Sequence, residues 1–142
     1  MIRCRVQTVS FDLGAEAAAL TAGRTDIGAV VTFTGLVRDV AMTLEHYPGM
    51  TERQMQSVAD AAAARWPVLA GTLIHRYGDL APGDPIVLVA VAASHRAAAF
   101  EAASFLIDWL KTRAPFWKHE AGNGWVAARA GDEAAAARWA RP

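Results

Sequence analysis

Apolar side chains recur along the chain with two different periods. Where apolar and polar residues alternate, or where β-branched apolar residues follow one another, the pattern predicts a strand. Strands are expected on these grounds at residues 2–9, 28–37, 42–47, 71–78 and 85–93. The run PIVLVAVAA at 85–93 is apolar enough to be covered on both faces. A hairpin is expected within residues 116–130, around an Asn-Gly turn.

Helical periodicity occupies the intervals between these strands. Asp12 is expected to cap a short helix that ends at Gly23. A second helix is expected to open at Thr51, with Gln54 in the capping-box position, and its apolar side chains recur every three or four residues as far as Trp66.

The longest expected helix has Ser94 as its N-cap and runs to about Arg113, because Pro115 cannot continue a helix. A last short helix is expected from Asp132. Hairpins therefore mix with helical crossovers, which favours an α+β fold. We expect a single domain over residues 1–142, with helices on an antiparallel or mixed sheet in an α/β-hammerhead-like arrangement. No glycine-rich nucleotide-binding motif is present in the sequence.

Composition narrows the function classes. The chain has 142 residues, of which 54% are hydrophobic and 20% charged, and its formal net charge is zero. No basic field indicates nucleic-acid binding, and the longest apolar run, residues 86–93, is too short to span a membrane. The one cysteine, Cys4, cannot form an intramolecular disulfide. Because the first residues lack a signal-peptide pattern, the cytoplasm is the expected location.

The distribution of basic residues is uneven. Only Lys111 and Lys118 are lysines, whereas the other basic residues are all arginines. The two lysines lie on either side of the break at Pro115, so both amines can reach one cavity from different walls. A buried lysine can lose its proton and act as a nucleophile or base, which an arginine cannot. Two alternatives stay open: the helix dipole favours a charged Lys111 that serves as a fixed cation, or the pair lies on a solvated face by chance.

Two further groups are candidates for substrate binding. His95 and Arg96 fall in the first turn of the longest expected helix, where free backbone N–H groups favour a phosphate or carboxylate. Arg38 follows the predicted strand that carries Phe33, and strand ends often hold substrate-contacting groups.

The remaining histidines are interpreted as structural. His46 and His75 lie in strand-like segments and are expected to be half-buried with satisfied hydrogen bonds. No group of histidines and carboxylates has metal-ligand spacing, so neither a metal nor another cofactor is expected.

Several segments together resemble the catalytic (large) subunit of molybdopterin synthase, the MoaE family. They are GAVVTFTGLVR, TLEHYPGM, the segment His95–Ala102 and LKTRAPFWKHE, and the similarity runs from about Gly28 to Trp139. The resemblance implies transfer of two dithiolene sulfurs to cyclic pyranopterin monophosphate. The sulfur comes from the thiocarboxylated C-terminal glycine of a small, ubiquitin-like carrier subunit. It also implies a homodimer of large subunits with one small subunit at each end.

The resemblance also implies roles for particular residues. Lys111 is expected to be the central catalytic amine, near the incoming carrier glycine, with Lys118 as its partner in catalysis. His95 and Arg96 are expected to hold the phosphate or the pterin.

Three further expectations follow from the same family. Arg38 is expected to line the pocket with Phe33 nearby, and Arg129 to be supplied across the dimer interface. Only three residues separate Arg38 from Met42, whereas the family has a loop several residues longer. This is either a true deletion or a segment missing from the sequence, and it affects closure over the pterin.

Two other functions compete with sulfur transfer. A non-catalytic scaffold would bind the ubiquitin-like carrier without processing the pterin, and the short loop after Arg38 favours it. An unrelated lysine-dependent Schiff-base enzyme is the third candidate, which borohydride trapping with a carbonyl substrate would reveal.

Overall fold

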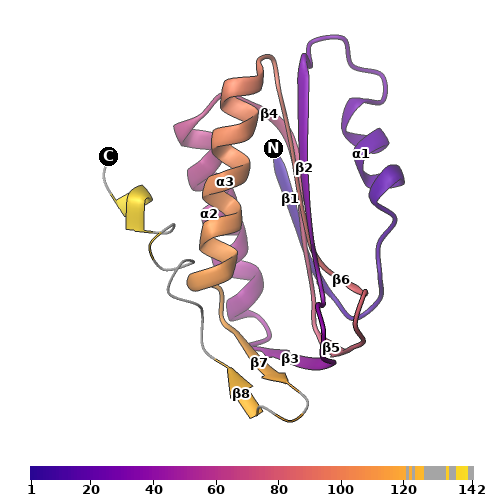
Figure 1. Ribbon diagram of the computed structural model, residues 1–142. Coiled ribbons are helices and arrows are strands. Elements are labelled where there is room, and N and C mark those ends of the chain that lie inside the picture. The colour runs from indigo at the N-terminus through magenta and orange to yellow at the C-terminus, as the bar shows by residue number, and fades with distance from the viewer. Residues whose placement is uncertain (121, 123, 127–133, 135–136, 141–142) are drawn as a thin grey trace.

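The computed structural model describes residues 1–120, 122, 124–126, 134 and 137–140 (Figure 1). Its helices are α1 (Leu13–Thr21), α2 (Met50–Arg65), α3 (Arg96–Thr112) and the short 3₁₀ helix η1 (Arg138–Ala140). Its strands are β1 (Ile2–Gln7), β2 (Ala29–Leu36), β3 (Met42–His46), β4 (Val68–Arg76), β5 (Gly78–Leu80), β6 (Pro85–Ala93), β7 (Phe116–Glu120) and β8 (Gly124–Val126). The expected α+β class is confirmed.

The larger sheet has the strand order β1-β4-β6-β2. β1 and β4 are parallel, and the other neighbouring pairs are antiparallel, so the sheet is mixed. α1 covers one face, whereas α2 and α3 cover the other (Figure 1). The β6 residues from Val87 to Ala93 are at most 5% exposed, which confirms a strand covered on both faces.

Side-chain alternation along these strands separates two apolar layers. Leu73 and Val89 pack with Met55 and Leu106 of the two long helices, whereas Ile74 and Leu88 pack with residues near α1. The first layer is the larger, and it ends at the last turn of α3.

The smaller sheet has the order β5-β3-β7-β8, with every neighbouring pair antiparallel. It lies at the end of the larger sheet where α3 stops (Figure 1). The β7–β8 pair confirms the expected hairpin for the residues that the structure describes. The sequence did not predict β5, because three residues carry no periodic pattern. Its first residue, Gly78, has φ +91°, and Tyr77 separates it from the end of β4 at Arg76.

The helix starts partly correct the sequence-based predictions. The Asp12 cap of α1 is confirmed, since its Oδ1 accepts a hydrogen bond from Ala15 N at 2.9 Å. Thr51 does not open α2, which begins at Met50; the Glu52 carboxylate accepts from Gly49 N at 2.8 Å and closes that turn instead. The residue spacing predicted the helix correctly, but the turn at Gly49 places its first residue one position earlier than predicted.

The expected Ser94 cap of α3 is wrong. His95 occupies the N-cap position and makes no side-chain cap hydrogen bond, while the Ser94 hydroxyl donates to Asp26 O at 3.4 Å. The loop before β2 therefore accepts the hydrogen bond from the hydroxyl that was expected to cap α3.

At the other end of the chain, the Trp139 indole donates to Asp108 Oδ2 of α3 at 2.6 Å and attaches η1 to that helix. The predicted helix start at Asp132 lies outside the described residues, and the extent of the domain over 1–142 stays a prediction.

Candidate active site

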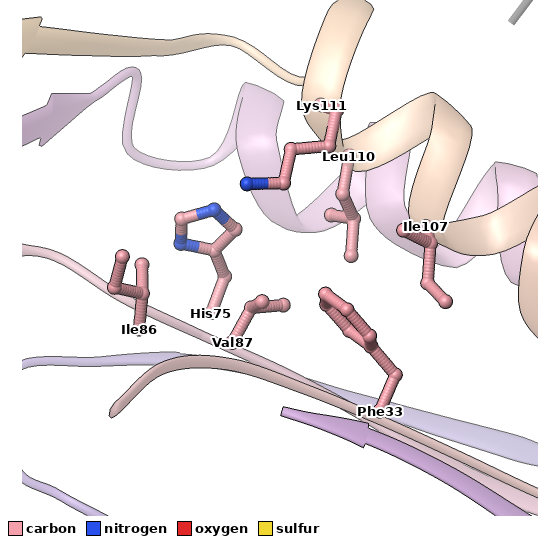
Figure 2. Close-up of a pocket in the computed structure, with 7 residues that line it drawn as sticks. All are labelled: Phe33, His75, Ile86, Val87, Ile107, Leu110 and Lys111. Atoms are coloured by element: carbon pink, nitrogen blue, oxygen red, sulfur yellow. The ribbon is translucent and has the colours of Figure 1, made fainter. Parts of the chain in front are cut away.

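A pocket opens beneath the last turns of α3, against one end of the larger sheet. Its volume is about 310 Å³, counting the space that is open to solvent. Figure 2 shows its walls, made by Phe33, His75, Ile86, Val87, Ile107, Leu110 and Lys111. Strands β2, β4 and β6 form the floor and α3 the opposite wall.

The strand register explains why these floor residues meet. His75 of β4 is paired with Val87 of β6, and Val87 is paired with Gly35 of β2. A Cβ on Gly35 would lie 2.8 Å from Val87 Cγ1 and 3.5 Å from the Phe33 ring. The missing side chain at Gly35 therefore leaves the space that Val87 and Phe33 occupy at the pocket floor.

The opposite wall is one face of a single helical turn. Ile107, Leu110 and Lys111 are three and four positions apart, so their side chains project from the same side of α3. Figure 2 shows the Lys111 amine extending over the pocket and pointing toward the His75 ring. An aliphatic stem against an apolar wall with the amine beyond it is the usual arrangement for a partly exposed lysine.

His75 is buried at the back of the pocket, 7% exposed. Its Nδ1 lies 2.8 Å from the carbonyl oxygen of Arg76, and its ring stacks on Phe116 with centroids 3.6 Å apart. Burial lowers the His75 pKa to about 4, helped by the charges of Lys111 and His46 and opposed by the hydrogen bond to Arg76. At neutral pH the imidazole is therefore uncharged.

Lys118 approaches the same region from the smaller sheet. It lies two residues after Phe116 on β7, so both side chains leave the same face of that strand. Its cross-strand neighbour is the buried Leu44 of β3. The face that presents Phe116 to His75 therefore also carries Lys118. Lys118 is not among the residues that line the pocket, so its convergence with Lys111 stays a prediction.

Comparison with known proteins agrees with this arrangement. The family model described as MoaE protein matches residues 6–113. This chain belongs to the MoaE family. A relative from Cereibacter sphaeroides, named molybdopterin synthase catalytic subunit, is 53% identical over 146 residues, covering 97% of this chain and all of the relative.

Two solved structures show how closely the MoaE fold is shared. The molybdopterin biosynthesis MoaE protein from Burkholderia ambifaria is 51% identical, with a TM-score of 0.87 and full coverage of both chains. The molybdopterin synthase from Staphylococcus aureus is 29% identical, with a TM-score of 0.78, and the match covers 86% of this chain and 95% of that one.

The structure does not bring every residue expected from the MoaE resemblance into the pocket. His95 and Arg96 are exposed at the start of α3, and Lys111 is in its last turn. At 1.5 Å per residue, the fifteen positions from Arg96 to Lys111 separate them by about 22 Å along the helix. Within one chain, the expected anion seat and the catalytic amine are therefore at opposite ends of α3.

Arg38 is also outside the pocket walls. It follows β2 with 67% of its side chain exposed, and its guanidinium lies 3.8 Å from the Asp39 carboxylate. Backbone bonds from Val37 N to Asp84 O and from Gly83 N to Val37 O hold the short connection from β2 to β3. Arg129, the remaining expected residue, lies outside the described residues.

Sequence reasoning missed His75 as a pocket residue. A histidine at the end of an apolar strand has no local feature that separates a structural role from a functional one. The information that places His75 in the pocket is long-range, because β4 and the end of α3 come together only in the folded chain.

Within the part of the chain that the structure describes, no three metal-ligating side chains form a group that could hold a metal ion. None of the described helices is long and apolar enough to cross a membrane.

Proposed function

We propose that this chain is the catalytic subunit of a molybdopterin synthase. It transfers sulfur from the thiocarboxylated C-terminus of a ubiquitin-like carrier to cyclic pyranopterin monophosphate, and forms the dithiolene of molybdopterin in the cytoplasm. The observation that carries this proposal is the Lys111 amine, which extends over a pocket in a fold whose relatives are named as the catalytic subunit of that enzyme.

The chain's own sulfur is poorly suited to be the transferred atom. Burial, with a smaller contribution from Asp60, raises the pKa of the Cys4 thiol to about 11, so the reactive thiolate is scarce at neutral pH. Cys4 is on β1, the edge strand farthest from β2 in the larger sheet. A carrier thiocarboxylate supplies the sulfur instead.

The two lysines are suited to binding an anion. Among the described residues, neither Lys111 nor Lys118 forms an ion pair with a carboxylate. Their positive charge is therefore available for a phosphate and for the carboxylate that the carrier tail becomes. In each transfer the carrier's C–S bond breaks and a C–S bond forms on the precursor. An oxygen atom from the precursor or from water completes the carrier's carboxylate.

The length of α3 bears on the proposed dimer. Because His95 and Arg96 lie about 22 Å from Lys111 along the helix, they do not share a small substrate with it in one chain. If these two residues hold the phosphate, they do so for the pocket of a second copy. The homodimer that the family resemblance implies would supply that copy, and it would supply Arg129 in the same way.

Reconstitution tests the activity. The purified chain is mixed with thiocarboxylated carrier and cyclic pyranopterin monophosphate, and dithiolene product is measured against a MoaE relative under identical conditions. Product is expected, and its absence while the relative succeeds refutes the proposed function. Carrier binding without measurable binding of the precursor would instead support the scaffold function, which the short connection after Arg38 favours.

Two substitutions at one position define the role of Lys111. Lys111→Ala is expected to lower turnover by about 100-fold or more, the usual range for a lost acid–base or charged catalytic group. Lys111→Arg keeps the charge but cannot lose a proton. Substantial activity in the arginine variant indicates a fixed cation, and little activity indicates that proton loss is required. Full activity in the alanine variant removes Lys111 from catalysis.

A further inference from the structure

His75 is the buried polar group of the pocket to which the resemblance assigns no role. Each side of its ring has a defined neighbour. Phe116 stacks on its face, the Arg76 carbonyl lies at Nδ1, and Val6 and Val87 flank it in the sheet. Figure 2 shows the remaining nitrogen, Nε2, on the side of the ring that faces the Lys111 amine.

The hydrogen bond at Nδ1 fixes the tautomer. A carbonyl oxygen can only accept, so Nδ1 carries the proton that it donates to Arg76 O at 2.8 Å. The ring is uncharged at neutral pH, as its lowered pKa of about 4 requires. Nε2 is then unprotonated, and its lone pair is directed toward the pocket.

The charged and titratable groups around the ring are few. Lys111 faces it from α3, and His46 approaches from β3, with its own Nδ1 3.0 Å from the Thr51 hydroxyl. Phe116 of β7 is apolar. Among the residues that line the pocket, Lys111 is the one with a cationic side chain, and its amine lies on the Nε2 side of the ring.

We propose that His75 is a positioning residue for Lys111: its unprotonated Nε2 faces the amine as a neutral acceptor and holds it over the pocket. The proposal rests on the proposed function in so far as Lys111 acts on the substrate. A neutral acceptor suits this position for an electrostatic reason. A carboxylate would neutralise the charge needed for an anionic substrate, whereas a second cation would repel the amine.

Two amide substitutions separate positioning from structural support. The Asn side chain reaches the place of Nδ1, so His75→Asn keeps a donor for the Arg76 carbonyl but lacks the acceptor. The Gln side chain reaches the place of Nε2, so His75→Gln keeps the acceptor. In the reconstituted complex we expect kcat to fall about tenfold in the Asn variant and to stay within about threefold of wild type in the Gln variant, with KM for the carrier unchanged in both.

The control is a second histidine, His46, which is half-buried. His46 contacts the Phe116 ring but does not line the pocket, so His46→Asn should leave kcat within about threefold of wild type. Thermal melts of all variants show whether each is folded. Equal kcat losses in both amides at position 75, or wild-type kcat in the Asn variant, overturn the proposal.

A second readout does not depend on turnover. The chain contains two lysines, so an amine-reactive reagent followed by mass spectrometry compares Lys111 with Lys118 as an internal reference. Release of the Lys111 amine in the Asn variant should raise its relative labelling about threefold, and the Gln variant should match wild type. An unchanged ratio in the Asn variant overturns positioning. If wild type transfers no sulfur, the proposed function fails, while this ratio still decides the role of His75.

Discussion

The neutral state of His75 makes folding stability depend on pH. In the unfolded chain this histidine titrates near its ordinary pKa of 6.5, whereas in the folded protein burial lowers the pKa to about 4. Between these values the unfolded chain binds more protons than the folded one, so acid favours unfolding. The stability associated with the neutral ring is present above pH 6.5 and is lost as the pH falls toward 4.

The size of the effect follows from the two pKa values. Going from pH 7 to pH 4.5, the difference between 6.5 and about 4 removes about 2 kcal/mol of unfolding free energy through this one group. The side chain is 7% exposed, so solvent screening reduces this figure little. His75→Gln has no titratable group at this position, and its stability should fall by about 2 kcal/mol less over the same interval.

Urea unfolding at pH 7, 5.5 and 4.5, at one protein concentration, measures the difference. Carboxylates also titrate in this range, but they are common to both proteins and cancel in the comparison. His95→Gln is the matched control, because it makes the same substitution at a histidine that is exposed at the start of α3. Curves for wild type and His75→Gln that stay parallel within about 0.5 kcal/mol would refute the reasoning.

Two further predictions concern the frame of the site. Gly35→Ala places a methyl group 2.8 Å from Val87 Cγ1 and should destabilise the protein by about 1–3 kcal/mol, which a thermal melt measures. If adding Val87→Ala in a double variant does not partly restore the lost stability, the steric explanation is contradicted. Asp12→Ala removes the bond to Ala15 N and should cost about 1 kcal/mol in urea unfolding, whereas Asp12→Ser should cost clearly less; equal losses would show that the cap contributes nothing.

Local periodicity predicted the fold where the deciding forces are local. The strand at 85–93 and the helix that ends before Pro115 follow from hydrophobic pattern and from proline's missing donor. Helix starts were less predictable, because distant backbone groups can compete with the helix for the hydrogen bond of a capping hydroxyl. Ser94 bonds to the carbonyl of Asp26, a residue 68 positions earlier that only the folded sheet brings near.

The candidate site divides along the same line. The convergence of Lys111 and Lys118 was predicted from a chain break between them, a feature that lies within eight residues. It stays a prediction, because only Lys111 is among the residues that line the pocket. Grouping both lysines with His95 and Arg96 required an estimate of the distance between them. The 17 residues of α3 separate His95 and Arg96, at its start, from Lys111 in its last turn. The place of His75 depended on the pairing of β4 with β6 and on the crossover that returns α3 above them, which no local pattern encodes.

The pairing of charges also bears on why the chain uses lysine at only two positions. Among the described residues, arginines pair with carboxylates at four places: Arg5 with Glu16, Arg24 with Asp26, Arg38 with Asp39 and Arg138 with Asp108. A planar guanidinium matches a carboxylate, so arginine suits these structural contacts. Both lysines instead lack a carboxylate partner in this part of the chain, and one of them faces a neutral imidazole. If ion pairing were the reason for basic residues near Pro115, arginine would serve there as it does elsewhere. The two amines are therefore better explained by an anionic ligand that supplies the negative charge.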